Sequence, residues 1–167
     1  RLQGSYPVIY LTFADIKADS YEDSKNSIIA VINEAYQAHR HLLESDVITD
    51  GEKNLFKAFD EYTNDSSSDK EIANEVVFRS IKVLSDCLYR YYNQKVIILL
   101  DEYDTPMQEA YIHGYWEEFT AFIRSLFNST FKTNPYLERA MMTGITRVSK
   151  ESVFSDLHNL NVVTTTS

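Results

Sequence analysis

The sequence has little cysteine, and it has no apolar run long enough to cross a bilayer. Cys87 is the single cysteine among 167 residues. One thiol cannot form an internal disulfide, so the sequence fits a reducing compartment, and we expect a cytoplasmic location. A spanning helix needs about 20 apolar residues, and neither such a run nor a signal peptide is visible. We therefore expect no membrane partner.

Glycine is also scarce, and no glycine is part of a phosphate-binding loop. Gly4, Gly51, Gly114 and Gly144 are the four glycines, and none begins a Gly-Lys-Ser or Gly-Lys-Thr triplet. The G-x-x-x-x-G-K-[ST] loop cradles phosphates with backbone N–H groups and a lysine, and this sequence lacks it. The chain begins without Met and stops after the β-prone run Val162 to Thr165. We expect both ends to be cut from a longer protein.

Positive charge is in deficit. Lys and Arg total 16 and Asp and Glu total 25, so the net charge is −9. A field of that sign repels phosphate backbones, so we expect no direct nucleic-acid binding by this segment. Hydrophobic residues make up 44% of the sequence, which is typical of a globular domain rather than a disordered chain.

Strand and helix patterns alternate along the chain. This alternation predicts an α/β domain with a mainly parallel sheet over residues 1–167. Strands are expected at Pro7 to Phe13, buried on both faces, at Val96 to Leu100, and at Ala140 to Ile145 with its opening at Leu137. Val162 to Thr165 is a candidate fourth strand. Helices are expected from Ser20 to Leu43, Gly51 to Tyr62, Ser68 to Tyr92 and Trp116 to Phe127, with capping boxes at Ser20–Asp23 and Ser68–Glu71.

We expect the first three strands to be parallel neighbours with Val96 to Leu100 in the middle. Their carboxyl ends would then share one edge, where ligands of open α/β sheets bind. An unfilled edge of this sheet could pair with another segment or another copy of the chain, because exposed strand edges invite pairing.

The strand Val96 to Leu100 runs into Asp101 and Glu102, which is a Walker B pattern. Asp101 would hold Mg²⁺, because hard oxygen ligands suit that ion. Glu102 would orient the water that attacks a γ-phosphate. Since adjacent strand residues point to opposite faces, the two carboxylates would have different roles. The alternative is a buried strand that ends in an acidic turn, with Asp104 as a supporting residue or a solvated helix cap.

Longer stretches resemble one known family. The segments PVIYLTFADIK, VIILLDEYDTP and MMTGITRVSKESVFSDLHNL are similar to the AAA-ATPase-like family of bacterial and archaeal proteins, which often carry a PD-(D/E)XK nuclease-like domain. The resemblance implies a three-layer P-loop NTPase-like core of the ASCE type, incomplete because the phosphate-loop strand is missing. It implies ATP and Mg²⁺ as ligands of the parent protein. It maps Asp101 and Glu102 to Walker B, Thr143 near the sensor-1 position, and Arg147 just beyond it.

Two other functions remain open. One is a signalling or scaffold module that keeps the fold without turnover. The other is a metal-dependent nuclease or phosphohydrolase that uses Asp101, Glu102 and Asp104, and it would need further carboxylates or a lysine at the same strand ends. Thr143 could also serve ordinary turn chemistry around Gly144.

Overall fold

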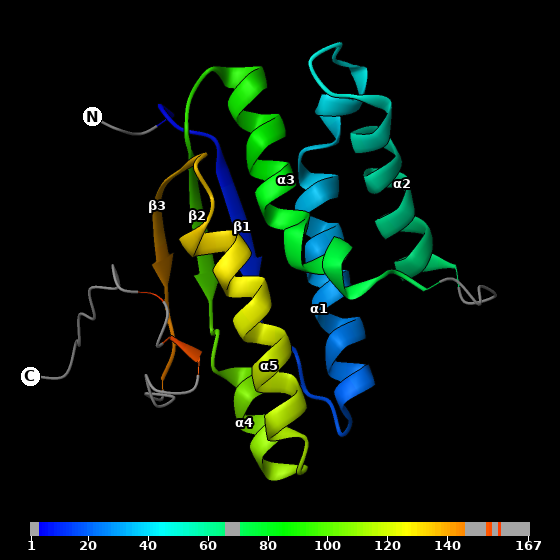
Figure 1. The fold of residues 1–167 in the computed structure, drawn as a ribbon, viewed down its shortest axis with the longest axis vertical. Helices are drawn as coiled ribbons and strands as arrows, with labels where there is room; N and C mark the ends of the chain where they lie inside the picture. Colours follow the sequence, from blue (N-terminus) through cyan, green and yellow to red (C-terminus); the bar gives the residue numbers. More distant parts are fainter. Residues whose placement is uncertain (1–3, 66–70, 146–152, 155–156, 158–167) are drawn as a thin grey trace, which may run out of the picture.

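The computed structural model describes residues 4–65, 71–145, 153–154 and 157. Strands alternate with helices, as the sequence pattern predicts (Figure 1). The elements are β1 (Val8–Thr12), α1 (Tyr21–Ala38), the 3₁₀ helix η1 (Arg40–Glu44), α2 (Asp50–Asn64), α3 (Asn74–Tyr92), β2 (Val96–Asp101), α4 (Thr105–Ile112), α5 (Trp116–Phe127), the π-helix η2 (Asn128–Lys132) and β3 (Leu137–Met142).

The three strands form one parallel sheet in the order β1-β2-β3. Thr12 lies opposite Asp101 at the end of β1 and β2, and Leu100 lies opposite Met142 near the end of β2 and β3. The predicted order is therefore confirmed, with β2 between its neighbours and all three carboxyl ends at one edge. β3 pairs with β2 and with no other strand of the described residues. Pairing of its outer edge with another copy stays a prediction.

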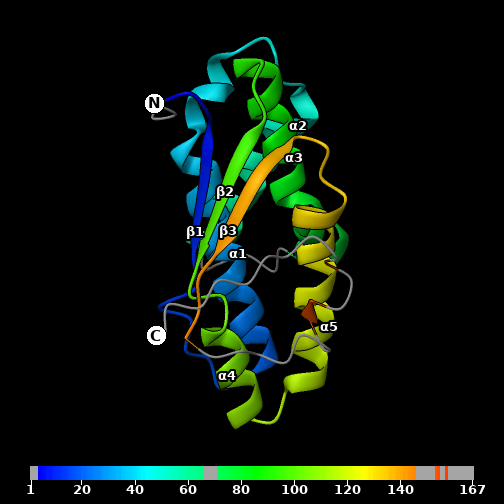
Figure 2. The ribbon, with the colours of Figure 1, turned by 90° about the vertical axis from the view of Figure 1, so that its left-hand side faces the viewer.

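The helices α1, α3 and α5 cover one face of the sheet, with α2 packed outside α1 (Figures 1 and 2). Ile9, Ile98 and Leu100 point into this helix-covered face and are almost fully buried. On the other face Tyr10 is 56% exposed. The expectation that the first strand is buried on both faces is therefore wrong. Among the described residues no helix covers this other face, so the expected third layer is not part of them.

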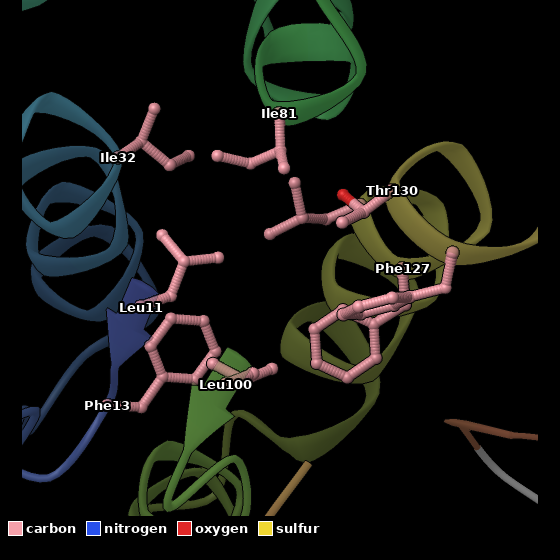
Figure 3. Close-up of a pocket in the computed structure, with 9 residues that line it drawn as sticks. Leu11, Phe13, Ile32, Ile81, Leu100, Phe127 and Thr130 are labelled. Carbon is pink, nitrogen blue, oxygen red and sulfur yellow. The ribbon is translucent and has the colours of Figure 1, made fainter. Parts of the chain in front are cut away.

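A cavity of about 10 Å³, close to the volume of one water-sized sphere, lies in the core under the sheet (Figure 3). Figure 3 shows side chains from β1, β2, α1, α3 and the α5–η2 junction pointing into it. They are apolar apart from Thr130 (Leu11, Phe13, Ile32, Ile81, Leu100, Leu126, Phe127, Phe131). The cavity is too small for an organic ligand, so we treat it as a packing defect of the core.

Helix boundaries differ from expectation in two places. The α3 helix begins at Asn74 with Ala73 as N-cap, and residues 71–73 are not helical, so a capping box at Ser68–Glu71 is wrong. The α4 helix begins at Thr105, after a turn at Tyr103 and Asp104 and outside the expected helix ranges, with Pro106 in its first turn. Proline suits that position because its missing N–H would have no partner there. The expected strand at Val162 to Thr165 lies outside the described residues.

None of the helices in the described residues combines the length and apolar character that crossing a bilayer requires.

Candidate functional site at the carboxyl edge of the sheet

The ends of β2 and β3 meet through Thr143. Its hydroxyl donates a hydrogen bond to the Asp101 carboxylate and accepts one from the Glu102 N–H at 3.2 Å. Its backbone continues the ladder, because the Thr143 N–H donates to the Leu100 carbonyl at 2.9 Å and its carbonyl accepts from the Tyr103 N–H at 3.0 Å. The sheet edge therefore brings Asp101, Glu102 and Thr143 together, although 41 residues separate Glu102 from Thr143 in the sequence.

Glu102 leaves the strand in an unusual conformation. β2 ends at Asp101, and Glu102 has a φ of 51°, in the left-handed region. A residue with a Cβ loses about 1–2 kcal/mol there, so the surrounding contacts must hold it. Thr105 provides one of them, since its hydroxyl donates to the Glu102 carboxylate at 3.2 Å. We had expected strand alternation to send the Asp101 and Glu102 side chains to opposite faces. Glu102 lies outside β2 instead, and its left-handed backbone conformation sets the direction of its side chain.

Asp101 belongs to the face of the sheet that the described helices leave uncovered. Side chains alternate along β2, and Asp101 shares its face with Ile97 and Leu99, which are partly exposed. Asp101 is itself partly exposed. The core cavity lies under Leu100 on the opposite face. The cavity is therefore separate from the carboxylate site, and the carboxylates can meet a ligand from the uncovered side.

Asp104 does not join this carboxylate pair. Its side chain is 1% exposed, and its Oδ2 atom accepts hydrogen bonds from the Ile145 N–H at 3.0 Å and from the Gln108 side-chain amide at 3.2 Å. A metal site built from Asp101, Glu102 and Asp104 would need this carboxylate to turn away from a backbone N–H. In the described part of the chain, no group of three or more His, Cys, Asp or Glu residues is arranged to hold a metal ion.

Arg147 lies outside the described residues, so its expected place beyond Thr143 is not tested.

Further along, Phe154 packs edge-on against Tyr103 with ring centroids 5.2 Å apart, and it stacks on Phe127 at 6.0 Å. The chain after β3 thus returns to the turn that follows β2. The sequence did not predict the contact of Thr105 with Glu102, and it left the role of Asp104 open. A hydroxyl three residues after Glu102 was the available signal for Thr105.

A sequence model of the family described as predicted AAA-ATPase matches residues 1–154. The chain belongs to this AAA-ATPase-like family. One relative is an uncharacterized protein of the vnfD 5′ region in Azotobacter chroococcum, 29% identical over 75 residues. That match covers 44% of this chain and 14% of the relative, so the chain spans a small part of that protein. No solved structure matches the chain.

Proposed function

We propose that this domain supplies the magnesium-binding and water-orienting half of an ATP-hydrolysing site. The observation that carries the proposal is the meeting of Asp101, Glu102 and Thr143 at the carboxyl edge of a parallel sheet, on its central strand and a neighbour. Ligands of open α/β sheets bind beyond this edge. Membership of the AAA-ATPase-like family supports the same chemistry, and a P-loop NTPase core is part of the proposal.

The residues present suit the proposed ligands. Asp101 offers partly exposed carboxylate oxygens, which are the ligands that Mg²⁺ prefers, so Asp101 is the residue that would hold the ion. Bound Mg²⁺ would neutralise charge on the phosphate oxygens. Glu102 would orient the attacking water and take up its proton. The Thr105 hydroxyl restricts where the Glu102 carboxylate can turn.

Thr143, which the family resemblance places near the sensor-1 position, would act on Asp101 and Glu102 rather than on the phosphates. A hydroxyl has one proton, and the Thr143 proton is donated to Asp101. In this arrangement Thr143 fixes the direction of the Asp101 carboxylate and holds the Glu102 N–H. Arg147, which the family resemblance places just beyond Thr143, lies outside the described residues, and a catalytic role for it stays a proposal.

The phosphates themselves need a second half of the site. The sequence has no Gly-Lys-Ser or Gly-Lys-Thr triplet, so the proposal assigns the backbone N–H groups and the lysine that would bind the phosphates to another segment. We therefore expect the 167-residue chain alone to bind Mg-ATP very weakly and to hydrolyse none. Micromolar binding in a calorimetric titration of this chain would contradict that expectation.

The test is steady-state ATP turnover and nucleotide affinity in the natural protein with its flanking sequence. Glu102→Gln keeps the shape and removes the charge, so it should leave Mg-ATP affinity nearly unchanged and lower kcat by about 10²-fold or more. Asp101→Asn should instead weaken the magnesium dependence of binding. Thr143→Val should lower kcat less than Glu102→Gln, because it removes one hydroxyl rather than a charge.

The outcomes separate this function from its rivals. Unchanged turnover in Glu102→Gln would reject the water-orienting role and leave an acidic turn. Nucleotide binding without turnover in the wild-type protein would favour the signalling or scaffold module. Magnesium-dependent cleavage of nucleic acid that survives loss of ATP binding would favour the nuclease.

A further inference from the structure

The side chain of Asp104 is buried at a position where an acid would ordinarily face water. It is 1% exposed, although Asp is almost never fully buried unless it is paired. The simplest explanation would be a cap for α4, since Asp104 is the N-cap residue of that helix. However, its side chain makes no capping hydrogen bond to the helix backbone. The carboxylate therefore has a use besides its bond from the Gln108 side-chain amide on α4.

That use is a contact with the loop after β3. Asp104 Oδ2 accepts a hydrogen bond from the Ile145 N–H at 3.0 Å. Between Ile145 and Thr143 lies Gly144, where an added Cβ would come within 2.8 Å of Asp104 Oδ1 and 2.6 Å of Tyr103 Cε1. Contacts this short essentially never occur at real Cβ atoms, so the loop approaches the turn as closely as a glycine allows.

The same loop carries the hydroxyl that holds the site carboxylate. Thr143 is bonded to Asp101, and Ile145, two residues later, is bonded to Asp104. The Tyr103 N–H and the Thr143 carbonyl join the two segments between these points at 3.0 Å. If the Asp104 carboxylate is removed, the loop keeps the backbone hydrogen bonds of Thr143 but loses the bond that holds Ile145 against the turn after β2.

We propose that Asp104 is a positioning residue, whose buried carboxylate anchors the loop 143–145 so that the Thr143 hydroxyl stays on Asp101. This role rests on the proposed function, because its effect on turnover passes through Asp101. In this role Asp104 would act through Thr143 and Asp101, not by binding nucleotide or metal itself. A misplacement of about 1 Å at a reacting group can cost 10²-fold in rate, so an anchor outside the site can control kcat.

The first measurement is ATP turnover in the natural protein with its flanking sequence. Asp104→Ala should lower kcat by about 10- to 100-fold and change the affinity for ATP without Mg²⁺ by less than about twofold, since other groups hold the phosphates. Asp104→Asn retains an oxygen that can accept the Ile145 N–H, so it should recover kcat to within about fivefold of wild type. Asp86→Ala is the matched control, because Asp86 bonds Arg90 on α3, and its kcat should not change.

The second measurement needs no ATP. Amide hydrogen exchange should become about tenfold faster or more at Ile145 and Tyr103 in Asp104→Ala, with the protection of α3 unchanged. If the wild-type protein hydrolyses no ATP, the proposed function fails and exchange alone decides whether Asp104 anchors the loop. Wild-type kcat in Asp104→Ala, or faster exchange confined to α4, would overturn the proposal and leave Asp104 as a residue of the helix start.

Discussion

Replacing Gly144 with alanine tests how closely the loop after β3 packs on the turn after β2. The added Cβ would lie 2.6 Å from Tyr103 Cε1, 2.8 Å from Asp104 Oδ1 and 3.0 Å from Asp104 Cγ. Tyr103 cannot easily give way, because its ring packs edge-on against Phe154. The Asp104 carboxylate cannot turn without weakening its bond to the Ile145 N–H.

The expected cost follows from this crowding. Forcing an extra carbon into a closely packed position costs about 1–3 kcal/mol. For a chain of this size, each kcal/mol lowers the melting temperature by about 2–4 °C. Gly144→Ala should therefore melt about 2–12 °C below wild type, and its unfolding midpoint in urea should fall with an unchanged m-value.

Gly51→Ala is the matched control for this substitution. Gly51 lies in the first turn of α2, and an added Cβ there would meet only the Thr49 hydroxyl oxygen, at an ordinary 3.8 Å. Alanine loses less conformational entropy in a helix than glycine, so Gly51→Ala should gain about 0.5–1 kcal/mol. A Gly144→Ala variant as stable as wild type would show that the loop is not seated on the turn as described.

Two further substitutions test the core and the α2–α3 contact. The Thr130 hydroxyl is buried with no hydrogen-bond partner among the described residues, so the isosteric Thr130→Val should raise the unfolding free energy by about 1–2 kcal/mol. Thr63→Val is the control and should give no such increase, because the Thr63 hydroxyl donates a hydrogen bond to the Phe59 carbonyl. Burial acts to raise the pKa of Glu52, but hydrogen bonds from groups that include the Thr49 N–H and the Arg90 guanidinium lower it overall. The unfolded chain therefore binds the proton more tightly, so stability from this carboxylate is present above about pH 4.5 and is lost as the pH falls through the lowered pKa; urea midpoints should fall more steeply with acid in wild type than in Glu52→Gln, and parallel pH curves would contradict this.

The strands were predictable because their residues leave few alternatives. A run such as Val96 to Leu100 is too short for a helix and too apolar for a loop. The strand order was predictable because strands that follow one another in the sequence usually lie side by side in the sheet. Burial on each face did not follow, because an apolar run does not say which faces other elements cover. Tyr10 shows the difference, being 56% exposed within an apolar strand.

Capping motifs were an uneven guide to helix starts, and the start of α5 at Trp116 was predicted from its apolar pattern without one. The Ser20 side chain accepts from the Asp23 N–H at 3.2 Å, as the spacing predicted. The same spacing at Ser68–Glu71 misled, since α3 begins at Asn74. A complete capping box occurs at Thr49–Glu52 instead, where the sequence had given only an approximate helix start. A four-residue capping motif indicates which hydrogen bonds are possible. The packing of the helix that follows determines which of these bonds are made.

The site was predictable as a set of residue types, but its internal bonds were not. The aliphatic strand before Asp101 and Glu102 indicated where two carboxylates would lie. The partner of the Thr143 hydroxyl depended on the alignment of β2 with β3, and that alignment shifts between Val96 and Ile97. A shift of one residue in a strand sends each side chain to the other face, so the spacing of residues along the chain could not place Thr143 beside Asp101.

The proposed division of roles between Asp101 and Glu102 is consistent with how few protons the neighbouring hydroxyls carry. Thr143 and Thr105 each have one, and the structure directs them to Asp101 and to Glu102. Each carboxylate therefore has its own threonine: Thr143, directly after β3, and Thr105, at the start of α4. Such paired bonds fix two adjacent acids in different directions, which the left-handed turn at Glu102 makes possible. The proposed separation of metal binding from water activation needs this difference in direction, because two acids that pointed the same way could both serve as ligands of one cation.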